Sequence, residues 1–473
     1  LSGDKIPLDP VIFDVKMRKQ KIGLFYDYYI TLQPTMPLLS SNTIDASIEY
    51  IIDNNYDSVL GIVDETHLYW EEINGKLFPL YNERVNRQYL NKIYKECGYF
   101  VSNSEVVLRN SRLGNHISTY KIPKNESIDI DRFEDLWVVD DTLRRKKIAI
   151  RVIGNKNVGL GHIYRMLTFA GILYRHDVIF YVNPVDDLAI KKIKENNYSY
   201  KLFESEQEFL TFAKKDCCDI VVNDILDTTK EYIISLKEND FFVVNFEDLG
   251  EGMNYSDLLF NSQYYINDMN KNHYYGYNYA ILKQDMYYQP PIDFNVTIKN
   301  VLLTFGGVDE NNLTMRTLKL LTKIYHNKIT ITVGLGYQYL SELKAMVLNY
   351  DNDIEIMQNI KNMAQQMRQS DVAITSKGRT IYELVALQVP SITIAQNERE
   401  MTHLFSDNVE GIISLNRDTE IEDEEITDAL KSIILDNHQR KMNYHKLGMY
   451  NIKRGLDNVI NILFEVYTET KNA

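Results

Sequence analysis

Residues 146–170 have the pattern of a strand that runs through a glycine turn and a histidine directly into a helix. Alternate apolar residues from Ile148 to Val152 predict the strand, and apolar residues at helical spacing after Met166 predict the helix. Gly159-Leu160-Gly161-His162 lies between them. Glycines permit a tight turn, and a new helix presents unpaired N–H groups to an anion. The segment therefore predicts an anion site with the histidine at its mouth, the alternative being an ordinary turn in which this histidine caps the helix.

The alternation of strands and helices repeats along two stretches of the chain, and each stretch contains four clear strand patterns. A pattern of this kind forms parallel sheets that are covered by helices. The predicted fold class is therefore α/β, with tandem Rossmann-like domains at 146–290 and 298–473 and a cleft between them. The expected strands are 148–153, 177–182, 220–222 and 242–246 in the first domain, and 301–305, 329–333, 372–375 and 391–395 in the second.

A second glycine turn follows a predicted strand in residues 371–397. Ser376, Gly378 and Thr380 place hydroxyl groups and bare backbone at the start of a predicted helix, where a diphosphate would be stabilised. Glu383 follows Thr380 by three residues, which is the spacing of a capping box. This glutamate either caps its own helix or points into the cleft, where its carboxylate would accept the two hydroxyls of a ribose.

Five segments between residues 146 and 470 occur in the order of a known family. They are GLGHIYRMLTFA (159–170), YYGYNYAILK (274–283), VLLTFGGVDENNLT (301–314), SKGRTIYELVALQVPSI (376–392) and a final helix opened by Arg454-Gly455. Together they resemble the UDP-sugar hydrolase of the pseudaminic acid pathway. That family has two Rossmann-like domains of the glycosyltransferase-B type and is related to the peptidoglycan N-acetylglucosaminyltransferase.

The resemblance implies that His162 is a catalytic base, which activates water against the anomeric carbon of a UDP-2,4-diacetamido-2,4,6-trideoxyhexose while UDP leaves. An imidazole near its neutral pKa can take this proton, and a departing diphosphate needs charge stabilisation but no metal or other cofactor. By the same match, Ser376, Gly378 and Thr380 hold the diphosphate, Glu383 the ribose, and Asn397 lies near the sugar. The full set of implied UDP-sugar-binding residues is Gly159, Gly161, Arg165, Gly306, Ser376, Gly378, Thr380, Glu383 and Asn397.

One departure concerns the segment after the predicted strand 220–222. The family commonly has Asp-x-Tyr there, whereas this chain has Asn223-Asp224-Ile225. Two alternatives to a hydrolase therefore stay open. One is a glycosyltransferase of the same fold, which uses an acceptor in place of water, and the other is a non-catalytic UDP-sugar-binding or scaffold protein.

Residues 1–143 form a separate predicted α/β domain, with strand patterns at 28–33, 58–63 and 98–101 and helix patterns at 43–53 and 86–97. The charged segment 143–147 is the predicted linker to the next domain. The domain contains ITLQPTMPLL (30–39), SVLGIV (58–63), RQYLNKIYKECGYFV (87–101) and SIDIDRFEDL (127–136). These segments resemble acylneuraminate cytidylyltransferases, the nucleotidyltransferases that join CTP to a nonulosonic, sialic-type acid.

This resemblance implies that Gln33 and Arg87 contact the nonulosonic acid and that Asp129 and Asp131 hold Mg²⁺. From the residues alone, the two aspartates lie on one face of an extended segment and can share a Mg²⁺, or else Asp131 is the N-cap of a following helix. The family's glycine-rich basic loop for the triphosphate of CTP is not among the residues from Leu1 onward. The domain is therefore expected to be truncated and inactive in nucleotidyl transfer, whereas a longer parent chain that supplies the loop would be active. A homodimer through this domain is also expected.

Composition restricts the partners and the compartment. The net charge is −14, and no cluster of Lys and Arg alternates with aromatic residues, so nucleic acid is not an expected partner. Cys97, Cys217 and Cys218 have neither zinc-ligand nor redox-motif spacing, which favours a reducing cytoplasm. No apolar run approaches the ~18 residues of a membrane span. The chain is thus expected to be cytoplasmic, and the two resemblances together imply a protein of nonulosonic acid biosynthesis.

Overall fold

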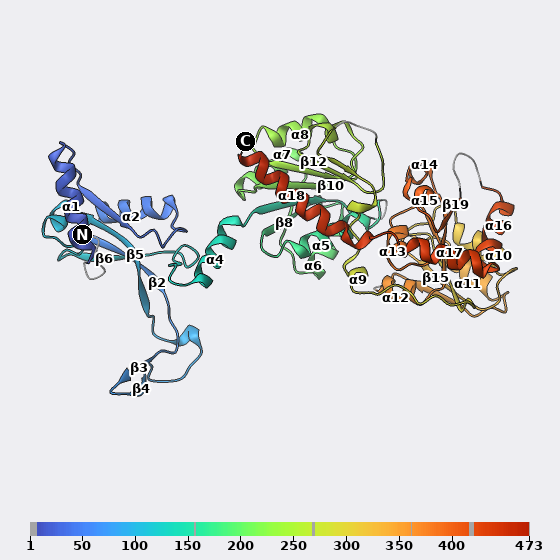
Figure 1. Cartoon of the computed structure of the whole chain (residues 1–473), viewed down its shortest axis with the longest axis horizontal. Helices are drawn as coiled ribbons and strands as arrows, with labels where there is room; N and C mark the ends of the chain where they lie inside the picture. Colours follow the sequence, from blue (N-terminus) through green and yellow to red (C-terminus); the bar gives the residue numbers. More distant parts are fainter. Residues whose placement is uncertain (1–6, 156–157, 267–269, 361, 416–420, 473) are drawn as a thin grey trace. The chain divides into compact units, whose positions relative to one another are not determined.

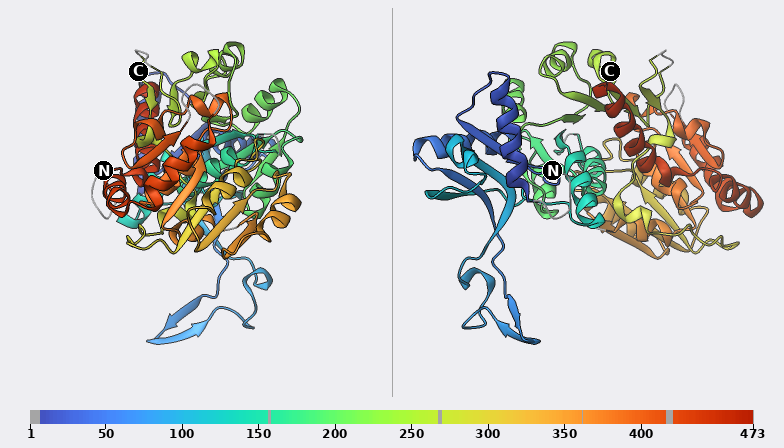
Figure 2. Two further views of the ribbon diagram at one scale, coloured as in Figure 1. Left: turned by 90° about the vertical axis from the view of Figure 1, so that its right-hand side faces the viewer. Right: turned by 60° about the vertical axis from the view of Figure 1, so that its left-hand side comes forward.

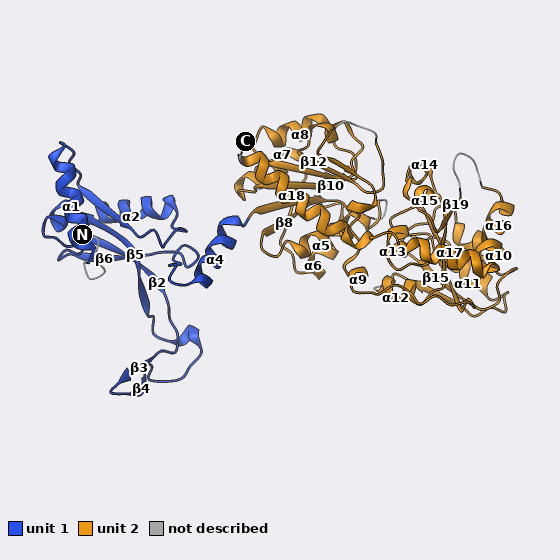
Figure 3. Ribbon diagram, in the orientation of Figure 1, with its two compact units in different colours: residues 1–145 blue, residues 146–473 orange. Residues whose placement is uncertain are grey.

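The structure is a computed structural model that describes residues 7–155, 158–266, 270–360, 362–415 and 421–472. It divides the chain into two compact units, residues 1–145 and residues 146–473 (Figure 3). The division falls inside the charged segment 143–147 that the sequence predicts as a linker. Within the described ranges, no helix combines the length and the apolar character that crossing a membrane requires.

Unit 1 is built on a mixed four-stranded sheet in the order β1-β5-β2-β6. β5 pairs antiparallel with β1 and β2, while β6 runs parallel to β2. Ile51 on α2 packs on one face of this sheet, against Val59, Tyr99 and Val101. Its elements are α1 (Leu8–Lys21), β1 (Tyr28–Leu32), α2 (Ser41–Asp53), β2 (Ser58–Asp64), β3 (Trp70–Ile73), β4 (Lys76–Pro79), the 3₁₀ turn η1 (Arg87–Tyr89), β5 (Tyr94–Asn103), α3 (Ser104–Leu108), β6 (Ile117–Lys121) and α4 (Phe133–Arg144).

The helix predicted over residues 86–97 is wrong. The apolar residues Leu90, Ile93, Tyr94 and Cys97 have helical spacing, but the chain forms only the short turn η1 there and then enters β5. β5 lies between two strands and forms ladder hydrogen bonds with both of them, which outweighs the local helical pattern. The hairpin β3–β4 precedes this strand and extends away from the body of the unit, as Figures 1 and 2 show.

The first half of unit 2 contains a seven-stranded parallel sheet in the order β13-β12-β11-β10-β7-β8-β9. Its four predicted strands are present as β7, β8, β10 and β11, while β9, β12 and β13 were not predicted. The elements are β7 (Lys147–Val152), α5 (Gly161–Ile172), β8 (Asp177–Val182), α6 (Asp187–Glu195), β9 (Tyr200–Leu202), α7 (Glu206–Lys215), β10 (Ile220–Asp224), α8 (Lys230–Lys237), β11 (Phe242–Phe246), η2 (Glu251–Tyr255), β12 (Leu258–Asn261), β13 (His273–Tyr275), η3 (Tyr277–Tyr279) and α9 (Gln284–Tyr287).

The second half contains a six-stranded parallel sheet in the order β16-β15-β14-β17-β18-β19. All four predicted strands are present, and β16 and β19 extend the sheet at its edges. The elements are β14 (Asn300–Thr304), α10 (Leu313–Leu321), β15 (Lys328–Val333), α11 (Leu340–Val347), β16 (Ile354–Gln358), α12 (Met363–Arg368), β17 (Val372–Ser376), α13 (Thr380–Ala386), β18 (Ser391–Ile394), α14 (Glu398–Met401), α15 (Phe405–Asn408), β19 (Ile412–Leu415), α16 (Asp423–Ile434), α17 (Asn437–Leu447), η4 (Ile452–Arg454) and α18 (Gly455–Asn472).

The predicted boundary of 298–473 for the last domain needs a correction at its end. The final helix α18 returns to the first half, where Leu456, Val459, Leu463 and Tyr467 are buried in the core around β7, β10 and β11. Burial of each aliphatic side chain contributes about 1.5–3 kcal/mol, which fixes α18 to that half. In Figure 1 this helix lies along the first half of the unit. The polypeptide therefore crosses between the halves twice, once after η3 and once at η4.

Candidate active site

The loop from β7 to α5 carries the histidine that the sequence singles out. Gly159 has φ +84°, a left-handed backbone that favours glycine, and α5 begins at Gly161. Residues 156 and 157 of the loop lie outside the described residues. Leu160 is the N-cap of α5 and provides no side-chain cap. His162 therefore does not cap the helix, and its ring is directed to another strand of the sheet.

His162 is paired with Asp224, the last residue of β10. The histidine Nδ1 lies 2.5 Å from Asp224 Oδ1. An ionised carboxylate only accepts hydrogen bonds, so Nδ1 carries a proton, and in the neutral imidazole Nε2 then keeps its lone pair. The carboxylate is fully buried, whereas the side chain of the histidine is 13% exposed. The neutral ring can thus accept a proton at Nε2 from a group that reaches its exposed side.

Arg165, one turn further along α5, holds the buried carboxylate in place. Its Nε and Nη2 donate to Asp224 at 2.7 and 2.5 Å, and its Nη1 donates to Glu247 at 3.0 Å. Burial by itself would raise the pKa of Asp224, but the charge of Arg165 and the hydrogen bonds from Arg165 and His162 outweigh it and hold this pKa well below its usual range. Asp224 therefore stays ionised. The predicted contact of Arg165 with a UDP-sugar stays a prediction, since these bonds direct the guanidinium to the two carboxylates.

Glu247 extends this cluster toward the second half of the unit. It follows β11, is buried, and has φ +52°, a backbone strain that non-glycine residues adopt mainly at sites the fold has fixed. Its carboxylate accepts from Ser262 Oγ at 2.5 Å and from the backbone N–H groups of Ser262 and Gln263, both at 3.2 Å. The loop after β12 is thereby held against the histidine cluster.

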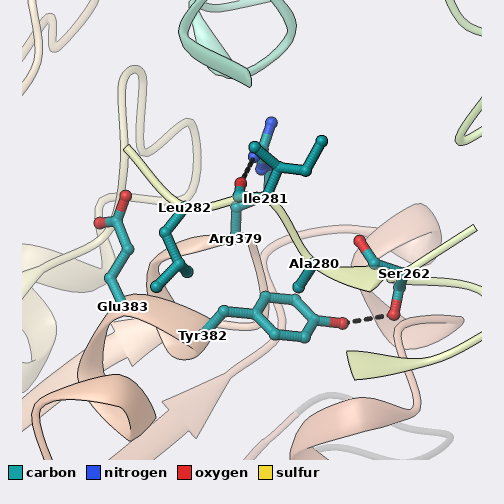
Figure 4. Close-up of a pocket in the computed structure, with 7 residues that line it drawn as sticks. All are labelled: Ser262, Ala280, Ile281, Leu282, Arg379, Tyr382 and Glu383. Carbon is teal, nitrogen blue, oxygen red and sulfur yellow. Dashed lines mark hydrogen bonds between the residues drawn. The ribbon is translucent and has the colours of Figure 1, made fainter. Parts of the chain in front are cut away.

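Two side chains of the second half close the site. Tyr382 Oη donates to the Ser262 carbonyl at 2.6 Å, and Arg379 donates to the carbonyls of Gly161 and Ile281 at 2.6 and 2.5 Å. The two glycine turns that the sequence predicts separately therefore meet at one place. The pocket there, drawn in Figure 4, is lined by Ser262, Ala280, Ile281, Leu282, Arg379, Tyr382 and Glu383.

The geometry of Glu383 separates its two predicted roles. Arg379 is the N-cap of α13, and this helix has no side-chain cap, so the capping-box arrangement is not formed. Glu383 instead lines the pocket (Figure 4), and its Oε1 lies 3.8 Å from Lys283 Nζ. Burial raises the pKa of Glu383, while the charges of Lys283 and Arg379 oppose that rise. The volume of the pocket is about 10 Å³, which holds about one water molecule, so the contact of Glu383 with a ribose stays a prediction.

The other predicted residues of the second half lie on neighbouring loops. Gly306 has φ +84° and follows β14, where Gln396 Nε2 donates to the Phe305 carbonyl at 2.8 Å. Asn397 accepts from the Glu400 N–H at 2.9 Å and is the N-cap of α14. The predicted contact of Asn397 with the sugar stays a prediction.

The predicted diphosphate loop has a carboxylate beside it. Ser376 is buried at the end of β17, and Thr380 is the first residue of α13. A methyl group at Gly378 would lie 3.4 Å from Ser376 Oγ and 3.6 Å from Glu400 Oε1. Burial raises the pKa of Glu400, and hydrogen bonds from Gln396, Ser376 and Lys377 oppose the rise. A diphosphate at this loop must therefore approach from the side that Glu400 does not occupy.

In unit 1 the structure brings three of the four predicted residues to one end of the sheet. Gln33 follows β1 and its N–H donates to the Gly98 carbonyl at 3.1 Å, while Ile130, between Asp129 and Asp131, donates to the Thr35 carbonyl at 2.8 Å. Asp129 Oδ1 is buried without a hydrogen-bond partner. In the part of the chain that the structure describes, no group of three His, Cys, Asp or Glu side chains is placed to hold a metal ion.

Two expectations for unit 1 remain, the contact of Arg87 with the nonulosonic acid and the role of Asp131 as a helix N-cap. Arg87 is exposed in η1, which follows the hairpin β3–β4 in the chain. The backbone hydrogen bonds from Gln33 to Gly98 and from Ile130 to Thr35 do not involve it. The alternative role of Asp131 as a helix N-cap is wrong. Arg132 is the N-cap of α4, and Asp135 Oδ2 accepts from the N–H groups of both Asp131 and Arg132.

Comparison with known proteins agrees with this architecture. Residues 301–456 match the model of the glycosyltransferase family 28 C-terminal domain. The crystal structure of MurG from Acinetobacter baumannii superposes with a TM-score of 0.54 at 12% identity, over 68% of this chain and 99% of that one. Unit 2 has a glycosyltransferase-B fold. The two parallel sheets are its two Rossmann-like halves, and the pocket lies where they meet.

Two sequence relatives extend the comparison. The spore coat polysaccharide biosynthesis protein SpsG of Bacillus subtilis is 23% identical over 340 residues, which are 68% of this chain and 99% of that protein. An uncharacterized protein of Methanocaldococcus jannaschii is 31% identical over 271 residues, or 53% of this chain. The chain spans about half of that archaeal protein, 56% of its length. The chain is therefore a glycosyltransferase-like protein, homologous to a spore coat polysaccharide biosynthesis protein.

Sequence reasoning missed Asp224 and Glu247 as members of the site. A signal for both was present, because each stands at or just after the carboxyl end of a buried strand in a predicted parallel sheet. Ligand sites of such sheets gather at the carboxyl ends of neighbouring strands. β10 is hydrogen-bonded directly to β7, with Asp224 opposite Val152, so the end of β10 lies beside the loop that carries His162.

Proposed function

We propose that unit 2 transfers the sugar of a UDP-sugar to an acceptor hydroxyl, with His162 as the catalytic base. The observation that carries the proposal is the buried Asp224 paired with His162 Nδ1, at the meeting point of two Rossmann-like halves. This arrangement leaves Nε2 as a proton acceptor one residue from Gly161, whose carbonyl is bonded by Arg379, and Arg379 and Glu383 line one pocket. The match of residues 301–456 to a glycosyltransferase domain supports sugar transfer.

In the proposed reaction, UDP lies on the second half, with its ribose at Glu383 and its diphosphate at the loop of Ser376, Gly378 and Thr380. The acceptor oxygen attacks the anomeric carbon, and the bond from that carbon to the β-phosphate oxygen breaks. His162 Nε2 takes the proton of the acceptor as the new bond forms. Asp224 stabilises the imidazolium that results, because it remains ionised and directly hydrogen-bonded.

Water is the second candidate acceptor, which would make the protein a UDP-sugar hydrolase. The observation that favours it is the segment GLGHIYR, which resembles that of the pseudaminic-acid-pathway hydrolase, and the resemblance implies that its histidine activates water. In that case the expected substrate is a UDP-2,4-diacetamido-2,4,6-trideoxyhexose. The comparisons with known proteins favour transfer to another acceptor over hydrolysis.

Release of UDP from this nucleotide sugar and from UDP-N-acetylhexosamines, measured with and without a panel of hydroxylated acceptors, distinguishes these functions. Both assays include a chelator, since neither reaction is proposed to need a metal. Release that depends on an acceptor supports transfer, and equal release without one supports hydrolysis. Tight binding of UDP without turnover under either condition would reject both and leave a UDP-sugar-binding protein.

The ribose assignment predicts a specific loss in Glu383→Gln. A hydrogen bond to a charged group contributes about 1.5–3 kcal/mol, so the affinity for UDP is expected to fall roughly tenfold to a hundredfold. The affinity for 2′-deoxy-UDP is expected to fall much less, because that ligand lacks one of the hydroxyls that the carboxylate accepts. Calorimetric titration of both ligands checks this result. Equal losses for UDP and 2′-deoxy-UDP would show that Glu383 does not contact the 2′-hydroxyl.

We further propose that unit 1 is a cytidylyltransferase-like domain for a nonulosonic acid. The support is the placement of Gln33, Asp129 and Asp131 at one end of the sheet, together with the unpartnered buried oxygen of Asp129. Mg²⁺ usually takes one or two protein carboxylates and completes its shell with phosphates and water, so these residues fit such an ion. Asp129 and Asp131 would hold it, and it would neutralise charge on the triphosphate of CTP.

Metal binding by unit 1 is testable without an activity assay. Mn²⁺, used as a spectroscopic probe in place of Mg²⁺, is expected to bind the wild-type chain and to be lost in Asp129→Asn, because this substitution removes a charged oxygen ligand. Electron paramagnetic resonance measures the bound fraction. Asp140→Asn is the matched control, since Asp140 pairs with Arg144 on α4 and is not in the proposed ligand set. Identical Mn²⁺ binding by wild type and Asp129→Asn would contradict the assignment.

A further inference from the structure

Arg379 is the side chain that joins the two predicted glycine sites. It is the N-cap residue of α13 in the second half, and its guanidinium reaches carbonyls on both sides of the pocket. Nη1 donates to the carbonyl of Gly161 at 2.6 Å, and Nη2 donates to the carbonyl of Ile281 at 2.5 Å. Gly161 immediately precedes His162 in the first turn of α5. A shift of the guanidinium would therefore move the backbone that carries the histidine.

The charge of Arg379 has no direct carboxylate partner. Among the described residues, no carboxylate oxygen forms an ion pair with it, and both of its hydrogen-bond acceptors are neutral carbonyls. Burial, together with the like charge of Arg165, lowers the pKa of Arg379 to about 10. Arg379 is partly exposed, but a cation that is even partly removed from water without a counter-charge is costly to keep. The two carbonyl bonds also leave further N–H groups of the guanidinium for a ligand.

Arg440 shows what a purely structural arginine looks like in the same half. It is 1% exposed, and its guanidinium donates to the carbonyls of Ile433, Ile434 and Val296. All of these bonds lie within the second half, away from the pocket residues. Arg379 has the same kind of neutral acceptors, but it lines the pocket and its bonds span the two halves. Because Arg379 lines the pocket and Arg440 does not, we infer that the two arginines have different roles.

We propose that Arg379 binds the diphosphate of the nucleotide sugar and, through the carbonyl of Gly161, sets the position of His162. This inference rests on the proposed function of unit 2. In the bound state the phosphate oxygens supply the counter-charge that the guanidinium lacks, and a planar guanidinium can contact phosphate and carbonyl oxygens at once. A bound diphosphate thereby fixes the turn from which the base acts.

The test compares uridine and UDP as ligands of the full chain. Arg379→Met is expected to lower the affinity for UDP at least about tenfold, the loss of one charged hydrogen bond, and to leave the affinity for uridine unchanged. Arg379→Lys keeps the charge, but an ammonium cannot span both carbonyls and the phosphate. This variant is expected to keep most of the affinity for UDP and to lose at least about tenfold in kcat with little change in KM. Calorimetry and UDP-release kinetics measure these quantities.

Arg440→Met is the matched control, because it removes a buried arginine with carbonyl partners from the same half. Its Tm is expected to fall while the ratio of UDP to uridine affinity stays that of the wild type. An unchanged ratio in Arg379→Met would overturn the proposed diphosphate contact, and an unchanged kcat in Arg379→Lys would overturn the positioning role. If the wild-type chain binds UDP no better than uridine, the nucleotide site of the proposed function is itself wrong.

Discussion

Replacement of His162 by alanine is expected to lower the rate of UDP release by about 10²- to 10⁴-fold, the usual contribution of a positioned general base. The affinity for UDP is expected to remain that of the wild type, because the ring is directed to Asp224 and the base acts on the acceptor. Both quantities are measurable on one preparation, by UDP-release kinetics and by calorimetric titration. The expected loss is in kcat, because His162 takes the proton of the acceptor in the transition state.

His176→Ala is the control for this substitution. His176 lies in the same half, but its ring stacks on Phe464 of α18, with ring centroids 4.6 Å apart, and its Nδ1 accepts from the Lys146 N–H. The control is expected to lose some stability and to keep its turnover. Full turnover in His162→Ala would exclude this residue as the base, for transfer and hydrolysis alike.

Replacement of Asp224 by asparagine is expected to have the second large effect. An amide group beside Nδ1 no longer enforces a proton there, so the imidazole can adopt the tautomer in which Nε2 is protonated and cannot accept. Loss of the orienting carboxylate in comparable catalytic triads lowers kcat by about 10⁴-fold, and we expect a fall of roughly 10²- to 10⁴-fold here. UDP-release kinetics over a pH series measure it.

The same substitution is expected to weaken the fold. It leaves Arg165 with Glu247 as its one full negative partner in the cluster, and breaking a buried ion pair costs about 3–5 kcal/mol. The pKa of Asp224 is lower in the folded protein than in the unfolded chain. Its contribution to stability is therefore present above the unfolded pKa and is lost as the pH falls through the folded pKa. Urea unfolding at several pH values compares wild type and variant.

Asp248→Asn separates the catalytic effect from the loss of stability. Asp248 is as fully buried as Asp224, but its carboxylate accepts from Thr228, Asn245 and Gly250, and it does not touch the histidine. This control is expected to unfold at a lower urea concentration and to keep its kcat. An equal fall of kcat in Asp224→Asn and Asp248→Asn would show that Asp224 acts only through the stability of the first half of unit 2.

The two Rossmann-like halves were predictable from the sequence because their central strands are continuous apolar runs. β7, β10, β14 and β17 are buried on both faces, which produces that pattern. The strands that were missed lie toward the edges and are short or mixed in character. The edge strands β9 and β16, for example, are only partly buried. An edge strand is stabilised mainly by hydrogen bonds to its one neighbouring strand, and its own sequence gives little signal of that pairing.

The site was predictable only in part for a related reason. His162 and Glu383 lie in local motifs near glycines and helix starts, so the adjacent residues in the sequence indicate their surroundings. Asp224 and Glu247 meet His162 and Arg165 only because three strands lie side by side. Arg379 needs both halves to be folded before its acceptors exist. Contacts between residues that are far apart along the chain depend on strand order, which the sequence pattern does not specify.

The return of α18 to the first half has a mechanical consequence. The halves of unit 2 are joined by two chain crossings, and these crossings touch, since a methyl group at Gly455 would overlap the backbone of Ala280. Ala280 is also a wall of the pocket. Any opening of the halves must therefore pivot close to this contact, which limits sliding and leaves mainly rotation. The part of the pocket wall farthest from Ala280 would then travel the greatest distance, while the wall at Ala280 stays nearly still.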